Sequence, residues 1–140
     1  TLYKDILSGY INLEYFLNYS NASNLDSNKN IIDGYYDGKY FYFTVFQTIN
    51  ITASIFIDVF FELLNTRYPK WEAYDLTKQK IANYTNTNEL LWNINFRKKI
   101  SSNVSIYLGI TWDKLMNNDT SKAYNKYTDW EYYGGVKLSY

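Results

Sequence analysis

Apolar side chains recur at every second residue in six stretches of this chain, and this period decides which secondary structure the chain can form. Successive side chains of a β-strand point to opposite faces, whereas an amphipathic helix repeats every three to four residues. The stretches cover residues 7–19, 40–49, 55–63, 90–97, 104–113 and 130–140. In the fifth stretch, Val104, Ile106, Leu108, Ile110 and Trp112 alternate with Ser105, Tyr107, Gly109, Thr111 and Asp113. We therefore predict one all-β domain over residues 1–140.

The connections between these stretches alternate in length. Those near 50–54 and 99–103 are tight turns, whereas those near 20–36, 65–88 and 115–127 are long and rich in Asn, Asp, Ser, Lys and Tyr. In an antiparallel up-and-down sheet, alternate connections lie at opposite ends. Short turns at one end and long loops at the other are typical of transmembrane barrels. Within 65–88 we expect a hairpin that projects beyond the membrane.

The two faces of the predicted sheet differ in chemistry. The apolar face has nearly thirty residues, many of them aromatic, and a barrel of about eight strands encloses only enough room for ordinary side chains. The middle of every strand is free of charge on this face, and a charge facing lipid costs least near the interfaces. We therefore expect the apolar face to contact lipid and the opposite face to line the lumen.

Charged side chains on the predicted lumen face need partners wherever they are buried. We expect them to form a salt-bridge and hydrogen-bond network rather than an acid–base site. Asp58 and Glu62 lie four residues apart on one strand, about 13 Å, which is too far for a glycosidase pair. The predicted network consists of Glu14, Asp58, Glu62, Arg97, Asp113, Glu131 and Lys137.

Aromatic residues cluster toward the two ends of the apolar runs. Such belts are typical of the interfaces between membrane and water. The predicted belt residues are Trp92, Trp112, Trp130 and Tyr132 toward the long connections and Tyr140 at the turn side. Further Tyr and Trp residues in the long connections offer contact area to an external partner.

The composition excludes several kinds of chemistry. The chain contains no His and no Cys, so Ser-His and Cys-His nucleophiles, thiolate sites and His-ligated metals have no residues to form them. Fourteen basic residues balance fourteen acidic ones, which gives no overall attraction to nucleic acid. We expect a non-enzymatic protein with no cofactor and no nucleic-acid partner.

The final residues "YGGVKLSY" resemble the C-terminal signature of Gram-negative outer-membrane β-barrel proteins. In this resemblance Tyr133 is the polar position, Gly135 the glycine, Leu138 the penultimate hydrophobic position and Tyr140 the terminal aromatic residue. The resemblance implies location in the bacterial outer membrane. It also implies that the barrel-assembly machinery reads the last strand, and that this strand pairs with the first to close the cylinder.

Six strands are fewer than the eight of the smallest single-chain barrels. Three explanations remain open: the chain is the C-terminal part of a larger barrel, several copies share one barrel, or two short strands lie within the long connections. We expect an antiparallel up-and-down transmembrane β-barrel of about eight strands, because barrels of this kind have nearly this length. Its expected partners are the lipid bilayer, the assembly machinery and other subunits or upstream strands.

Three functions are consistent with these patterns. The first is a surface-exposed structural or adhesive protein with a lumen filled by side chains. The second is a passive porin-like channel, mildly cation-preferring because inward carboxylates exceed inward cations. The third is a soluble β-barrel that carries an apolar ligand, with the apolar face turned inward.

Overall fold

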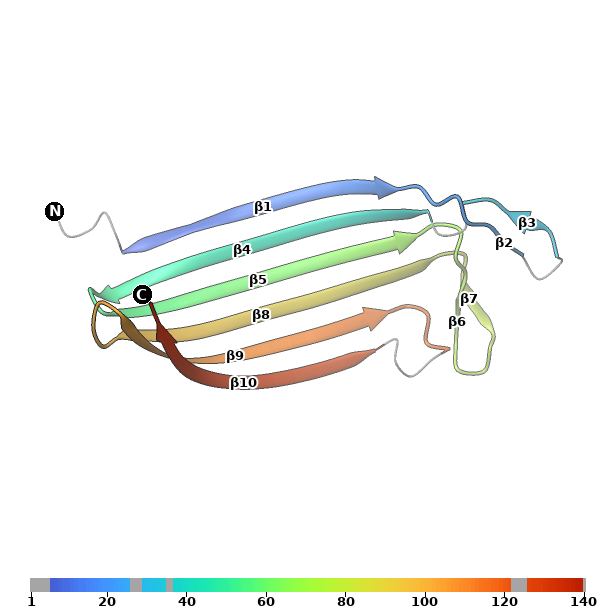
Figure 1. Ribbon diagram of the computed structural model, residues 1–140. Helices are drawn as coiled ribbons and strands as arrows, with labels where there is room; N and C mark the ends of the chain where they lie inside the picture. Colours follow the sequence, from blue (N-terminus) through green and yellow to red (C-terminus); the bar gives the residue numbers. More distant parts are fainter. Residues whose placement is uncertain (1–5, 26–28, 35–36, 122–125, 140) are drawn as a thin grey trace.

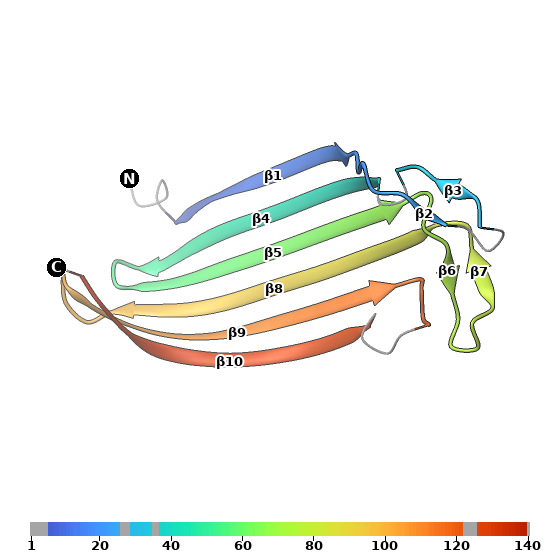
Figure 2. The ribbon, with the colours of Figure 1, turned by 45° about the vertical axis from the view of Figure 1, so that its right-hand side comes forward.

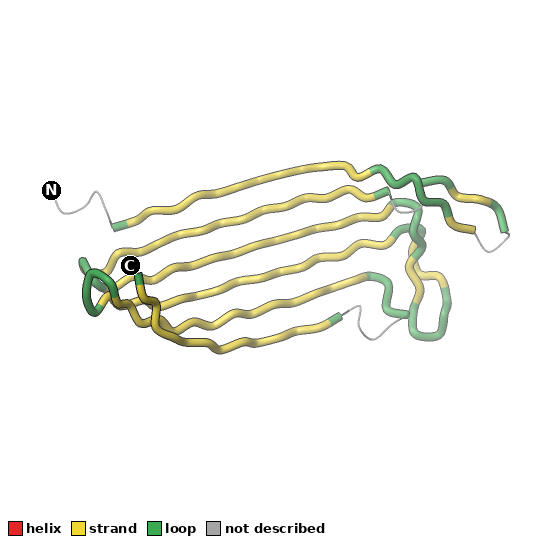
Figure 3. The backbone as a smooth tube through the Cα atoms, in the orientation of Figure 1, coloured by secondary structure: helices red, strands yellow, loops and turns green. Residues whose placement is uncertain are grey.

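The structure is a computed structural model that describes residues 6–25, 29–34, 37–121 and 126–139. Strands dominate it, and the described residues contain no helix (Figure 3). Six long strands form the main sheet (Figure 1). They are β1 (Leu7–Asn18), β4 (Gly38–Thr52), β5 (Ile55–Tyr68), β8 (Thr85–Lys99), β9 (Val104–Asn117) and β10 (Tyr127–Leu138). No helix in the described residues is long and apolar enough to cross a membrane.

The main sheet is an antiparallel meander in which each long strand pairs with the next one along the chain, in the order β1-β4-β5-β8-β9-β10. This confirms the predicted all-β, up-and-down topology. The turns between β4 and β5 and between β8 and β9 are short, as predicted, and lie at one end of the sheet (Figure 2). We call this the turn end, and the other the long-connection end.

Two small hairpins lie within the long connections. One pairs β2 (Asn24–Leu25) with β3 (Ile31–Ile32), and the other pairs β6 (Ala73–Tyr74) with β7 (Lys80–Ala82). The second is the hairpin predicted within 65–88. Asp75 stabilises its turn, because its side chain accepts hydrogen bonds from Thr77 N, Thr77 Oγ1 and Gln79 N at 2.7–2.8 Å. Both hairpins form sheets of their own, so they add no strand to the main sheet.

The main sheet is open in the described residues. Strands β1 and β10 are its two edges, each paired with one neighbour, and no closed barrel is detected. The eight-stranded closure expected from the sequence is therefore absent from this structure of the single chain. Alternation determines which residues form strands and which face each side chain takes, but it does not determine which strand an edge pairs with.

Candidate functional site on the polar face

The strand register sorts the predicted apolar side chains onto one face of the main sheet. Residues that lie directly opposite one another on neighbouring strands form a row, and the rows in the middle of the sheet cross all six strands. The row at the middle of β1 consists of Ile11, Val45, Phe61, Trp92, Trp112 and Trp130. The row at the start of β1 consists of Leu7, Ile49, Ile57, Phe96, Leu108 and Gly134. We call this side of the sheet the apolar face and the other the polar face.

The apolar face lies uncovered. Leu108 is 65% exposed and Val136 is 61% exposed, and Ile11 on the β1 edge is 73% exposed. Among the described residues the only buried hydrophobic side chain is Ala73, which lies in a small hairpin and not in the main sheet. The main sheet therefore encloses no apolar core, and exposed apolar side chains on β1, β8, β9 and β10 are typical of a surface that contacts an apolar environment or partner.

Three of the predicted belt residues contact one another on the apolar face. Trp92, Trp112 and Trp130 are direct partners in one row, and their ring centroids lie 5.6–6.2 Å apart. Tyr132 lies one row nearer the turn end and is 75% exposed. On β10 this cluster marks the limit of the apolar residues toward the long-connection end, whereas on β9 Met116 follows on the same face beyond Lys114. Tyr140 lies outside the described residues.

All residues of the predicted charge network share the polar face, and the register separates them by sign. The acidic band occupies three neighbouring rows in the half of the sheet toward the long connections, and no cation of the six strands falls among them. Its members are Glu14, Glu62, Glu89, Asp113, Asp129 and Glu131. The cations on this face, Arg97, Lys99 and Lys137, lie at the turn end with a single carboxylate, Asp58.

Carboxylates of the acidic band find hydroxyl and amide partners in place of the predicted cations. Tyr42 donates to Glu62 Oε2 at 2.7 Å, and Tyr127 donates to Asp113 Oδ2 at 2.9 Å. Asn12 donates to Glu14 Oε1 at 2.8 Å. The structure thus brings the predicted residues onto one face, but joins only Asp58 and Arg97 as an ion pair among those described.

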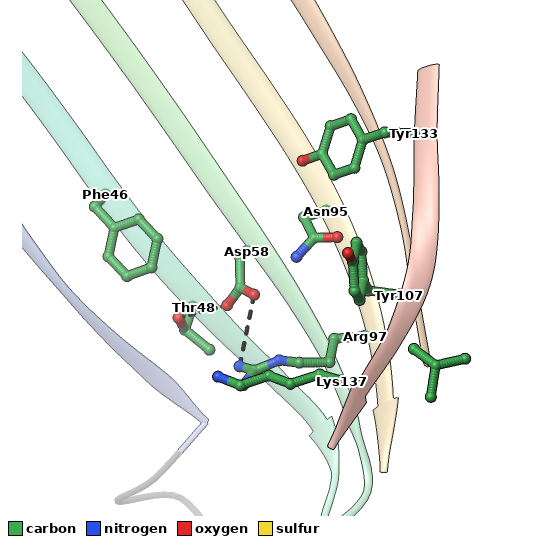
Figure 4. A pocket seen from close by; sticks show the side chains of 9 residues that line it. Phe46, Thr48, Asp58, Asn95, Arg97, Tyr107, Tyr133 and Lys137 are labelled. Atoms are coloured by element: carbon green, nitrogen blue, oxygen red, sulfur yellow. Dashed lines mark hydrogen bonds and ion pairs between the residues drawn. The ribbon is translucent and has the colours of Figure 1, made fainter. Parts of the chain in front are cut away.

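Asp58 and Arg97 meet at the turn end, where the sheet curls around a cavity of about 710 Å³ (Figure 4). An Arg97 terminal nitrogen lies 3.5 Å from Asp58 Oδ2, and Thr48 donates to Asp58 Oδ1 at 2.7 Å. The Arg97 guanidinium also lies 4.9 Å from the centre of the Phe56 ring. Side chains from β4, β5, β8, β9 and β10 line this one cavity, and all of them except Val136 belong to the polar face, so the polar face is the inner side of the curl.

Two glycines make room for two tyrosines beside this cavity. Gly109 is the direct partner of Tyr133, and Gly135 is the direct partner of Tyr107. A Cβ at residue 109 would lie 2.3 Å from Tyr133 Cζ, and one at residue 135 would lie 2.7 Å from the Tyr107 hydroxyl. Each ring therefore lies over the glycine of the neighbouring strand. The Tyr133 hydroxyl also accepts a hydrogen bond from Asn93 Nδ2 at 2.7 Å.

Sequence reasoning missed several members of the polar face. Glu89 and Asp129 lie on it because β8 and β10 begin earlier than the alternation indicated, at Thr85 and Tyr127. Glu89 and Asp129 each lie two residues before a residue of the polar face, Leu91 and Glu131. Extending the alternation in the sequence by two residues would therefore have placed them on this face. The partners of the carboxylates, such as Thr48 and Tyr42, depend on the register between strands, and a single strand's pattern does not contain it.

Comparison of the chain with protein-family models, curated proteins and solved structures found no match. The polar face and its cavity therefore have to be interpreted from their own geometry.

Proposed function

We propose that this chain forms the wall of a non-enzymatic β-barrel in the bacterial outer membrane, with the apolar face toward lipid and the polar face toward an enclosed interior. The observation that carries the proposal is the pairing of an uncovered apolar face with an opposite face that holds hydrogen bonds, an ion pair and a cavity. A water-soluble sheet would have the reverse exposure, because burial of apolar surface drives its folding.

The position of the apolar residues along each strand supports tilted strands. On β1 the apolar series runs from Leu7 to Leu17, and on β10 it runs from Trp130 to Leu138. The register places Leu7 of β1 level with Gly134 of β10, and Ile11 level with Trp130. At the long-connection end the β10 series therefore begins only at the level of Ile11. At the turn end it extends to Leu138, beyond the level of Leu7. The series thus shifts by about one residue per strand, a slope of roughly 35° at ~3.3 Å per residue and ~4.8 Å between strands. Strands of closed barrels tilt by ~35–45°.

Charged residues frame the apolar face at both ends. Lys39, Arg67 and Lys114 lie on this face toward the long connections, and Lys98 lies on it near the turn end. Long basic side chains at such positions extend their charge to the interface while their methylene groups cover apolar surface. The predicted tryptophan belt lies next to Lys114, which matches the usual order of residues at a membrane boundary.

The two open edges of the sheet determine how this chain can pair with further strands. Strands β1 and β10 run antiparallel to each other, since six strands alternate in direction between them. Either edge therefore accepts a further antiparallel strand from upstream sequence, from a second copy, or from the opposite edge. Assembly through the barrel-assembly machinery, with Gly135, Leu138 and Tyr140 as its recognition residues, belongs to this proposal.

Within this architecture we favour a surface-exposed structural or adhesive protein over a channel. The supporting observation is that large side chains, among them Phe46, Tyr107 and Tyr133, occupy the inner side of the curl. A channel is the second candidate, and the acidic band favours cation passage through it. Planar-bilayer recordings separate the two, because a closed interior gives no stepwise conductance.

Extraction and electrophoresis test the architecture itself. We expect the native protein to stay with membranes after carbonate and salt washes, to need detergent for release, and to migrate differently on gels before and after heating. Partition into water without detergent would contradict the proposal and favour the soluble carrier.

A further inference from the structure

The cavity at the turn end of the polar face carries a local excess of positive charge. Arg97, Lys99 and Lys137 belong to the last two rows of the polar face, and Asp58, one row further in, is the single carboxylate near them. Arg97, Lys137 and Asp58 line the cavity directly. Figure 4 shows the Lys137 side chain running alongside Arg97 beneath Asp58. Two cations thus share one counter-ion within the cavity.

Two buried polar atoms in the cavity lining have no hydrogen-bond partner among the described residues, Arg97 Nε and Asn95 Oδ1. Asp58 accepts a hydrogen bond from Thr48 with one oxygen and faces a terminal nitrogen of Arg97 with the other, and no hydrogen bond joins it to Arg97 Nε. Buried polar groups are nearly always paired, so these two atoms show that the residues lining the cavity have hydrogen-bonding capacity which the described residues do not satisfy. An Asn amide presents either its oxygen or its NH₂ group to the same point by rotating.

We propose that this cavity binds a small oxyanion, a carboxylate or a phosphate. Arg97 and Lys137 provide the charge, the Asn95 amide provides a further donor, and the rings of Tyr107 and Tyr133 form one wall. Arginine is suited to this role because its planar guanidinium matches the geometry of both anions. The inference rests on the proposed function in one respect, namely that the polar face is enclosed from bulk water.

The charge pattern also sets the direction of approach. The acidic band lies between the cavity and the long connections and repels an incoming anion, whereas the cations lie nearest the turn end. An anion therefore reaches the cavity from the turn end.

Isothermal titration of the folded full chain in detergent tests the site, with sodium phosphate and sodium acetate as separate probes. We expect one equivalent to bind, and the tighter of the two probes identifies the class of anion. Lys137→Gln should weaken binding by about tenfold, as the loss of one charge-assisted hydrogen bond requires. Arg97→Gln should do the same. Asp58→Asn should tighten binding, because it removes the competing carboxylate.

Lys98→Gln is the matched control, since Lys98 is adjacent to Arg97 in the chain but lies on the apolar face. It should leave the affinity within twofold of the native chain. Absence of binding to the native chain, or equal losses for Lys98→Gln and Lys137→Gln, would overturn the inference. Should Arg97→Gln fail to fold, Lys137→Gln and Asp58→Asn still decide the outcome by their opposite signs. A chain that folds into bilayers but binds neither anion contradicts the inference alone, whereas a chain that stays in water contradicts the proposed function.

Discussion

Tyr133 of β10 lies directly across from Gly109 of β9, and its ring occupies the space where a side chain at residue 109 would begin. The hydroxyl of Tyr133 then reaches Asn93 on β8, which donates to it at 2.7 Å. One tyrosine thereby links three strands, β8, β9 and β10. An aromatic ring that covers a glycine on a neighbouring strand is a recognised device for fixing register in curved sheets.

Gly109→Ala should destabilise the fold although alanine is the better strand residue. The new methyl group would lie 2.3 Å from Tyr133 Cζ, and moving the ring away breaks the bond from Asn93. We expect a loss of ~1–3 kcal/mol in the free energy of unfolding, the usual cost of overpacking. Urea titration in detergent micelles measures it. In a Tyr133→Ala background the same change should be neutral or stabilising by ~0.5 kcal/mol, and an equal loss in both backgrounds would contradict the role assigned to Tyr133.

Gly135→Ala separates two explanations for why residue 135 is a glycine. The resemblance to outer-membrane proteins assigns Gly135 to recognition by the assembly machinery, whereas the register places it under the Tyr107 ring. The structural role predicts a loss of up to ~1–3 kcal/mol in purified protein, with relief when Tyr107→Ala is added. The loss should be the smaller of the two glycine changes, because a Cβ at residue 135 would come no closer than 2.7 Å to the tyrosine ring, against 2.3 Å at residue 109. Unchanged stability in detergent, together with failed assembly in cells, would show that recognition alone requires the glycine.

Much of this fold follows from the sequence because its signals are local. Alternation over residues 104–113 is enough to form β9 and to place Ile110 and Thr111 on opposite faces, as the register confirms. The contacts between side chains on the polar face could not be predicted from alternation alone. The contact of Thr48 with Asp58 depends on which residue stands opposite, and the β4–β5 turn sets this through a shift between Asn50 and Thr52. Closure could not be predicted either, because the edges of β1 and β10 have the same backbone groups whichever strand they meet.

The β6–β7 hairpin should lose order at low pH. Hydrogen bonds from the Thr77 hydroxyl and from the backbone of Gln79 lower the pKa of Asp75 below its ordinary value. A depressed folded-state pKa means that the stabilising contribution is present above the unfolded-state value of ~3.9 and is lost as pH falls through the folded-state value. Protection factors of the Thr77 and Gln79 amides, which correct the exchange rates for their intrinsic pH dependence, measure this transition by NMR from neutral pH downward.

Asp75→Asn is the control for the hairpin, because it keeps the acceptor oxygen and removes the titration. It should abolish the pH dependence of these protection factors between neutral pH and pH ~2. An exchange midpoint above the ordinary carboxyl value, or one that Asp75→Asn leaves in place, would show that another group is responsible.

The slope of the apolar series predicts different depths for two residues in the same row. Ile11 and Trp130 stand level with each other across the sheet. Tilted strands should nevertheless bring Ile11 near the bilayer centre and Trp130 to the interface. Single cysteines at the two positions, labelled with a fluorophore and quenched by lipids brominated at different depths, report this directly. Equal depths would mean that the strands run straight across the bilayer and that the slope has no structural meaning.

Two neighbouring residues on β9 point to opposite faces of the sheet, so they report most directly which face contacts lipid. Spin labels at Ile110→Cys and Thr111→Cys, in chain reconstituted into bilayers, can be probed by collision with oxygen, which enters lipid, and with a water-soluble nickel chelate. We predict that the label at residue 110 collides with oxygen and not with nickel, and that the label at residue 111 does not collide strongly with oxygen. The opposite pattern, or equal access of nickel to both labels, would contradict it.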